Sequence, residues 1–79
     1  VSRLLHVTLP LMEGEDVQAL QLALIAAGYH CGIKGANGVY GRETAQAVRF
    51  YQAYHGMIVD GKAGKYTVKA LGGVWEPEA

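Results

Sequence analysis

Hydrophobic residues recur at helical spacing in three stretches of the chain, and glycine follows each stretch. In residues 15–27 the apolar face consists of Val17, Leu20 and Leu24, with Gln21 and Ala27 at its borders. A second stripe runs through residues 42–54 to the residue that follows them, and is made of Thr44, Ala47, Val48, Tyr51 and His55. Residues 65–71 form a third, shorter stretch. Because glycine commonly ends helices, and stands here at positions 28, 56 and 72–73, the pattern predicts three helices.

The two ends of the chain lack this periodicity. "RLLHVTLPLM", before the first helix, alternates poorly and contains Pro10, so we expect an extended lead-in that packs along the helices. The closing "GGVWEPEA" is typical of a linker or a frayed end. We therefore predict one domain over residues 1–73 and a linker or frayed tail over residues 74–79. The chain begins at Val1 rather than Met, and we expect it to be a piece of a longer protein.

A twelve-residue unit occurs twice. "NGVYGRETAQAV" (37–48) returns as "DGKAGKYTVKAL" (60–71), and a weaker echo, "GEDVQAL", opens the first helix. Four identities are each 23 residues apart: Gly38 and Gly61, Gly41 and Gly64, Thr44 and Thr67, Ala47 and Ala70. Each unit reads as a glycine turn that leads into a helix. The predicted fold is therefore all-α, a compact three-helix module with two repeated Asx-Gly turn and helix units.

The turns themselves have a predicted geometry. In Asn37-Gly38 and Asp60-Gly61 the Asx side chain can bond the backbone two residues on, while the glycine accepts positive φ. A second glycine stands at each helix entrance, Gly41 in the first unit and its counterpart in the second. There we expect the missing Cβ to let the loop approach a neighbouring helix closely. The structural turn residues are thus Asn37, Gly38, Gly41, Asp60, Gly61 and Gly64.

The composition of the chain argues against some classes of binding partner. The chain has 79 residues, 51% of them hydrophobic, and seven basic residues balance seven acidic ones. This zero net charge argues against binding to nucleic acid or to an anionic membrane, since both need an excess of Lys and Arg. No apolar run approaches the ~20 residues of a membrane span, and no signal-peptide pattern is present. The charges are uneven, because six basic residues between positions 17 and 75 face only Glu43 and Asp60.

The sequence gives little support for a catalytic site or a metal site. Cys31 is the single cysteine, so no intramolecular disulfide can form. His6, His30, Cys31 and His55 do not have zinc-ligand spacing, and no histidine is placed to activate the thiol. The acidic residues are explained by helix starts, the Asx turn and the tail rather than by a catalytic pair. We predict no catalytic residue, no metal site and no cofactor.

Three blocks of the sequence, in order, resemble the peptidoglycan-binding-domain-like family of three-helix modules found in bacterial and phage cell-wall hydrolases. They are "LPLMEGEDVQALQLALIAAGY", "GANGVYGRETAQAVRFYQ" and "HGMIVDGKAGKYTVKAL", which together cover about residues 9–71. Asn37 stands where the family more often has Asp, and Arg42 and Lys65 stand where proline is frequent. The resemblance implies a non-catalytic module that binds peptidoglycan and targets an attached amidase, lysozyme, peptidase or endolysin to the cell wall. It implies a bacterial cell-wall or periplasmic location, reached by secretion or with a phage lysin.

Candidate ligand contacts follow from the chemistry of peptidoglycan, whose stem peptides have free carboxylates and whose sugars can stack on aromatic rings. Arg42 and Lys65 stand at helix entrances, and Arg49 falls on the outward face of the second helix. The full set of candidate ligand-binding residues is Tyr29, Lys34, Asn37, Arg42, Arg49, Phe50, Tyr54 and Lys65. Two interpretations stay open for the aromatic members, Tyr66 and the loop "HCGIKGAN": they line a groove between the connection of the first two helices and the second helix, or they pack in the ordinary way at the edges of the helix faces. For the cations, the alternative is ordinary solvated surface charge.

A second hypothesis stays open beside peptidoglycan binding. Leu22 and Phe50 fall off the core faces of their helices, and they could dock on another protein in a small helical interaction domain that never touches murein. Tyr40 and Tyr51 are expected in the core. We expect a monomer, because nothing in the sequence demands more.

Overall fold

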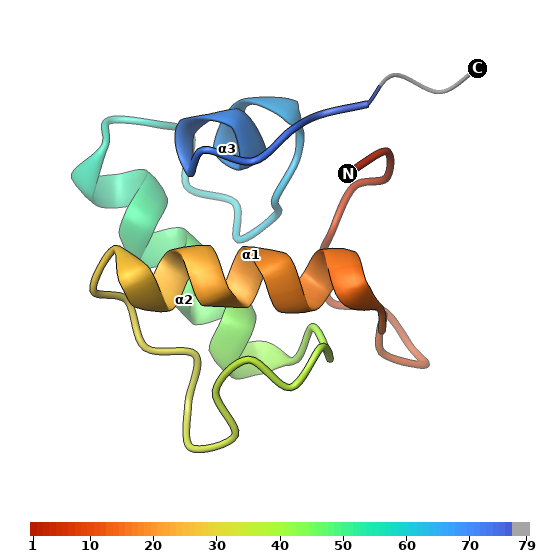
Figure 1. Ribbon diagram of the computed structural model, residues 1–79. Helices are drawn as coiled ribbons and strands as arrows, with labels where there is room; N and C mark the ends of the chain where they lie inside the picture. The colour runs from red at the N-terminus through yellow and green to blue at the C-terminus, as the bar shows by residue number, and fades with distance from the viewer. Residues whose placement is uncertain (77–79) are drawn as a thin grey trace.

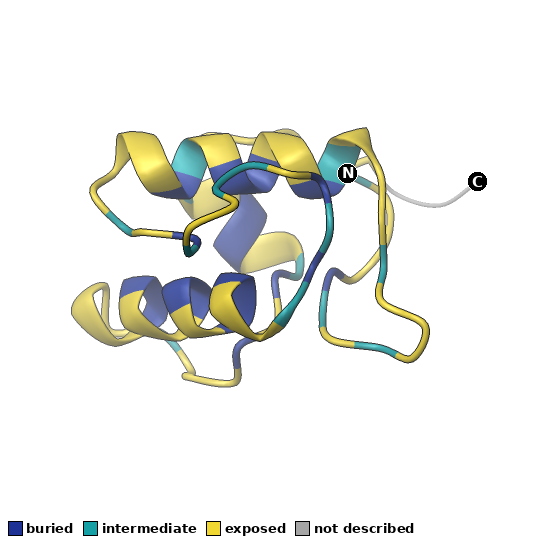
Figure 2. Cartoon of the chain, turned by 90° about the horizontal axis from the view of Figure 1, so that it is seen from below, coloured by how far each residue is buried: buried dark blue, intermediate teal, exposed yellow. Residues whose placement is uncertain are grey.

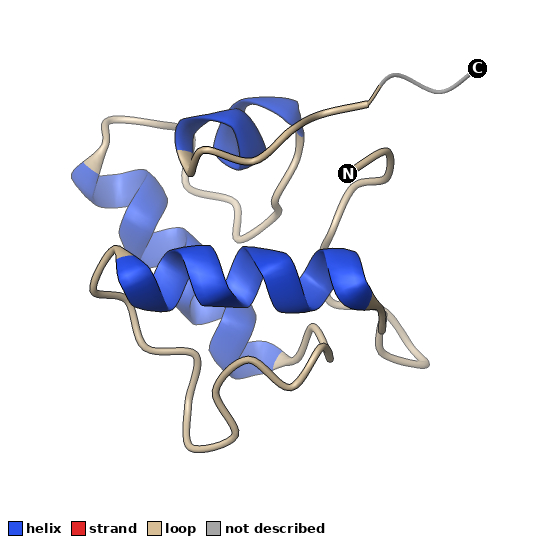
Figure 3. Ribbon diagram, in the orientation of Figure 1, coloured by secondary structure: helices blue, strands red, loops and turns tan. Residues whose placement is uncertain are grey.

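Three helices, in a computed structural model that describes residues 1–76, confirm the predicted all-α fold (Figure 1). They are α1 (Glu15–Ala26), α2 (Arg42–Tyr54) and α3 (Lys65–Ala70). The predicted helix starts match, and α1 and α3 each end one residue earlier than predicted. Loops make up the remainder of the described chain, apart from two isolated backbone bridges (Figure 3).

Glycine marks both ends of every helix. The N-cap residues are Gly14, Gly41 and Gly64, and no side chain caps any of the three helices. At the other end, the glycine after the C-cap has a positive φ of 96°, 66° and 87° at Gly28, Gly56 and Gly72. The next amide then bonds back to the helix in a Schellman motif: Tyr29 N to Leu24 O, Met57 N to Gln52 O and Gly73 N to Val68 O, at 2.8, 2.9 and 2.9 Å. The glycines thus stop the helices as predicted.

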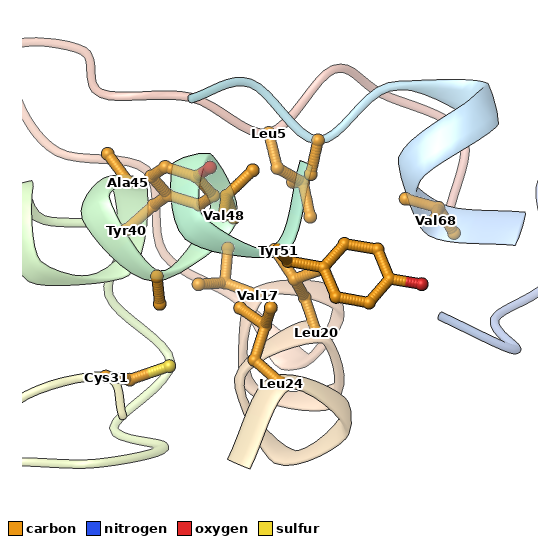
Figure 4. Close-up of a cluster of buried hydrophobic side chains, with 12 residues drawn as sticks. Leu5, Val17, Leu20, Leu24, Cys31, Tyr40, Ala45, Val48, Tyr51 and Val68 are labelled. Carbon is orange, nitrogen blue, oxygen red and sulfur yellow. The ribbon is translucent and has the colours of Figure 1, made fainter. Parts of the chain in front are cut away.

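The buried faces of the helices turn toward one another (Figure 2). Figure 4 shows side chains from all three helices and Leu5 of the lead-in meeting in one core. The predicted core residues are buried: Val17, Leu20, Leu24, Thr44, Ala47, Val48, Tyr40 and Tyr51. His55 and Ala27 are exposed instead, because α1 and α2 end beside them. The His55 ring stacks on Tyr51 at a centroid distance of 4.1 Å.

The lead-in pairs with the two repeated units. Its Leu5 exchanges two backbone hydrogen bonds with Ala63 at 3.1 and 2.8 Å, and Tyr40 N donates to Met12 O at 2.9 Å. The Arg3 guanidinium donates to both oxygens of the Asp16 carboxylate, from Nε to Oδ2 at 2.8 Å and from Nη2 to Oδ1 at 3.0 Å. This ion pair lowers the pKa of Asp16. The lead-in therefore bonds to the units' loops through its backbone, while Leu5 packs in the core with side chains of the helices and Arg3 bonds to α1.

Residues 74–76 lie beside the start of the chain. The Val1 ammonium donates to Val74 O at 2.7 Å, and Glu76 N donates to Val1 O at 2.7 Å. Trp75 packs against the core at partial burial. The domain boundary at residue 73 remains a prediction, and the rest of the predicted tail, residues 77–79, lies outside the described residues.

Candidate functional site

A buried glutamine holds the turn of the second unit. Gln52 of α2 is 2% exposed. Its Oε1 accepts the backbone amides of Asp60 and Gly61 at 3.1 and 3.0 Å. Its Nε2 donates to Asp60 Oδ1, Lys62 O and Thr67 Oγ1 at 2.9, 3.0 and 3.2 Å. One side chain thus joins α2, the Asx-Gly turn and the first turn of α3.

Gln21 of α1 does the same in the first unit. Its Oε1 accepts Gly38 N at 2.8 Å, and its Nε2 donates to Asn37 Oδ1, Val39 O and Thr44 Oγ1 at 3.3, 3.0 and 2.9 Å. Sequence analysis put Gln21 at the border of the helix face and gave Gln52 no role. The two glutamines are 31 residues apart, not 23, so a fixed-offset comparison does not align them. The signal that could have found them is a glutamine in the helix before each Asx-Gly pair.

The predicted Asx-turn bonds are present in both units. Asn37 Oδ1 accepts Val39 N at 3.1 Å, and Asp60 Oδ1 accepts Lys62 N at 2.9 Å. The following glycines have φ of 78° and 71°. The backbone bond from Lys62 is the main reason that the pKa of Asp60 lies below its usual value.

The expectation for Gly41 and Gly64 was wrong. Both have ordinary negative φ, and neither lies tightly against a helix. A Cβ at Gly41 would meet Leu11 of the lead-in at 3.9 Å, and one at Gly64 would meet Leu4 at 3.4 Å. These are ordinary contacts with flexible side chains. The two glycines end the loops beside the lead-in rather than permitting a close approach to a helix.

Each unit borders a surface hollow. The second-unit hollow has a volume of about 430 Å³, and its lining includes Leu4, Met57, Ile58, Lys62, Lys65 and Tyr66. The first-unit hollow, of about 190 Å³, is bordered by Leu11, Lys34, Asn37, Val39, Glu43 and Thr44. The structure thus divides the predicted contacts, with Lys65 in one hollow and Lys34 and Asn37 in the other.

A third hollow lies between α1, α3 and the chain start. Its volume is about 310 Å³, and its lining is apolar apart from acidic groups at the start of α1, Glu15 and Asp16. Glu15 disfavours a carboxylate ligand here, because like charges repel, whereas the charge of Asp16 is compensated by Arg3.

The candidate aromatic residues are not gathered around one hollow. Tyr29 is half-buried and packs edge-on against Tyr51, with 5.4 Å between ring centroids, and lies 6.2 Å from Tyr54. Tyr54 and Phe50 are 80% and 53% exposed on α2. Tyr66 instead borders the second-unit hollow. The aromatic side chains and the "HCGIKGAN" loop therefore do not line a single hollow.

Two candidate cations lie outside the hollows. Arg42 is exposed at the start of α2. Arg49 is also exposed, but its side chain lies over the second-unit turn, where its Nη1 and Cγ would be 2.8 and 3.2 Å from a Cβ on Gly61. Arg49 therefore covers that glycine.

Reactive groups are few in residues 1–76. Cys31 is buried, and burial raises the pKa of its thiol, which disfavours the nucleophilic thiolate. Within these residues no cluster of three or more His, Cys, Asp or Glu side chains could hold a metal ion. None of the helices in this part of the chain is long and apolar enough to cross a membrane.

Comparisons with known proteins show which family this fold belongs to. Residues 13–71 match the family described as "Putative peptidoglycan binding domain". The chain is 48% identical over 61 residues to the N-acetylmuramoyl-L-alanine amidase CwlL of Bacillus licheniformis, an alignment that covers 77% of this chain and 17% of that protein. The chain thus spans less than a fifth of that amidase's length.

Two solved structures share the fold. The SleB N-terminal domain superposes with a TM-score of 0.79 at 34% identity, covering 90% of both chains. The Burkholderia AP3 phage endolysin gives a TM-score of 0.76 at 38% identity, covering 87% of this chain and 24% of the endolysin. The matches to the amidase and the endolysin take up only a small part of each protein, as expected for a binding module beside a catalytic domain. From the family match over residues 13–71 and this shared fold, we conclude that the chain belongs to the peptidoglycan-binding domain family and is a non-catalytic binding module.

Proposed function

We propose that this domain binds peptidoglycan and holds an attached cell-wall hydrolase on its substrate. The observation that supports the proposal most strongly is the family match over residues 13–71, together with the small share of the matched amidase and endolysin that this domain covers. The attached enzyme is an amidase, lysozyme, peptidase or endolysin.

Binding would work by local concentration. A module that holds the enzyme on an insoluble mesh turns each further encounter with substrate into an intramolecular event, at effective concentrations up to about millimolar. Weak affinity is then sufficient, and the domain needs no chemistry of its own. We propose that it acts as a monomer in the bacterial cell wall or periplasm, after secretion or delivery with a phage lysin.

The ligand contacts that we propose are cationic and aromatic. Stem peptides offer carboxylates to Lys34, Arg42, Arg49 and Lys65, and sugar rings or peptide methyl groups can pack on exposed Phe50 and Tyr54. The structure supports this chemistry to the extent that the cations are exposed. Asn37 and Tyr29 are less available to a ligand, because Asn37 is hydrogen-bonded within its turn and Tyr29 packs on Tyr51.

Co-sedimentation with sacculi stripped of protein and secondary polymers tests the proposal. The folded domain should pellet with sacculi and remain in solution without them. The Arg42→Ala and Arg49→Ala variants, with Lys69→Ala as an exposed control on α3, should show which cations contribute. A folded wild-type domain that stays in the supernatant would rule out peptidoglycan binding and favour the protein-interaction hypothesis.

A further inference from the structure

The two hollows are copies of one architecture. Five lining positions of the first correspond to five of the second at the 23-residue offset: Asn37 and Asp60, Val39 and Lys62, Gly41 and Gly64, Glu43 and Tyr66, Thr44 and Thr67. Each hollow also receives one lead-in leucine, which lies against the N-cap glycine of the unit's helix. The repeat has therefore duplicated a surface hollow along with a turn and a helix.

The corresponding positions differ in chemistry. In the first unit, the Glu43 carboxylate lies over the connecting loop, in the space that a side chain on Gly32 would need. In the second unit, the same position holds Tyr66, which is 79% exposed. Lys62 replaces Val39, so a second lysine joins Lys65 at the second-unit hollow. The second hollow thus has two lysines and an exposed tyrosine beside Asp60, while the first has one lysine, Lys34, beside the Glu43 carboxylate.

The lysines of the second-unit hollow are available for a ligand. Neither Lys62 nor Lys65 forms an ion pair with another residue of the described chain. The one carboxylate at this hollow, Asp60, is already bonded to the Gln52 amide and to a backbone amide of its own turn. Apolar surface from Met57 and Ile58 lies beside these charges. A volume of about 430 Å³ is within the usual range for a small-ligand site.

We propose that the second-unit hollow binds the stem peptide of peptidoglycan, with its free carboxylate at Lys62 and Lys65 and its methyl-bearing side chains against Tyr66 and Ile58. Charge complementarity favours this hollow, because it combines two lysines with one carboxylate, whereas the first-unit hollow has one lysine, Lys34, beside Glu43, and the third hollow presents Glu15. The inference rests on the proposed function and assigns it to one of two repeated sites.

An NMR titration locates the site directly. The ¹⁵N-labelled domain is titrated with a synthetic stem tetrapeptide that has a free C-terminal carboxylate, and separately with its C-terminal amide. The largest changes in amide shift should fall in residues 56–67, with smaller changes in residues 37–44, and the peptide with a C-terminal amide should bind about fivefold more weakly, as expected for the loss of an exposed ion pair. Shifts confined to the first unit, or equal affinity for both peptides, would overturn the assignment.

A matched exchange between the units supplies the second test. Tyr66→Glu places the first unit's residue in the second-unit hollow, and Glu43→Tyr makes the reverse change. Both positions are exposed, so circular dichroism and melting should show folded variants. We expect Tyr66→Glu to reduce pelleting with sacculi at least fivefold and Glu43→Tyr not to reduce it. If the wild type and Tyr66→Glu pellet equally, the site assignment is wrong and peptidoglycan binding stands; if the wild type fails to pellet, both are wrong.

Discussion

Two buried glutamines hold the repeated turns in place. The side-chain amide of each glutamine bonds the backbone N–H and C=O groups of a tight turn, which water would otherwise bond. No buried side-chain polar atom in the described chain lacks a hydrogen-bond partner. Because a buried amide with four or five partners leaves several polar groups unpaired when it is removed, these positions should be among the most sensitive in the domain.

Gln52→Ala should lower the free energy of unfolding by about 2–4 kcal/mol, because it removes the Gln52 hydrogen bonds of the buried Gly61 amide and Thr67 hydroxyl. Gln46→Ala, an exposed change of the same type on the same helix, should stay within about 0.5 kcal/mol. Urea unfolding followed by circular dichroism measures both. Equal losses for the two variants would contradict the role given to Gln52.

Asp60→Asn should change the pH dependence of stability. The folded-state pKa of Asp60 is lowered, so its stabilising effect is full above the unfolded pKa and is lost as pH falls through the folded pKa. Asn can make the same turn bond, as Asn37 does in the first unit. Urea midpoints measured between about pH 5 and pH 2 should therefore fall less steeply for Asp60→Asn than for the wild type. Asp16, whose pKa is also lowered, should account for part of the slope that remains.

Much of this residue-level detail could not be predicted from the sequence. The repeat and its Asx-Gly pairs predicted the turns, because those residue types have local backbone chemistry. The glutamine contacts are not local, since each links a helix to a turn across a connection of different length in the two units. The same limit applies to Arg49: helical period placed it facing outward, but the period contains no information on the turn that it covers.

At the level of elements, glycine sets where each helix begins and ends. Helix boundaries were predictable to within one residue because the C-terminal glycines adopt a conformation that other residues rarely adopt. The course of the lead-in was not predictable, since its pairing with Ala63 and Tyr40 is a long-range backbone contact without a periodic signature.

Gly56→Ala should cost about 1 kcal/mol, because φ at this position is 66° and nothing lies within 4 Å of the added Cβ, so the penalty is purely one of backbone conformation. Gly56→Asn should cost less, since Asn tolerates this region better. Gly41→Ala, at negative φ, has no such backbone penalty and should lose only the preference of an N-cap position for glycine over alanine, which is smaller. Thermal melting compares the three variants, and a larger loss for Gly41→Ala than for Gly56→Ala would show that the N-cap glycine has a role beyond the one seen here.

At the scale of the whole molecule, two copies of one unit have diverged. The shared residues, Gln, Asx, Gly and Thr, build the turn and helix, while the side chains that differ at the hollows are Val39 against Lys62 and Glu43 against Tyr66. Sequence reasoning identified the family and the cationic middle of the chain. For the aromatic candidates it left a groove and ordinary edge packing both open, because a residue at the border of a helix's apolar face does not reveal which hollow its side chain reaches.

The central claim is that this domain binds peptidoglycan and does not cleave it. Purified sacculi are incubated with increasing amounts of the domain, and the pelleted protein and the soluble fragments released are measured in the same samples. The account predicts saturable pelleting, reversal on dilution and no release of fragments above the protein-free control. Release of soluble muropeptides, or a folded domain that never pellets, would contradict it.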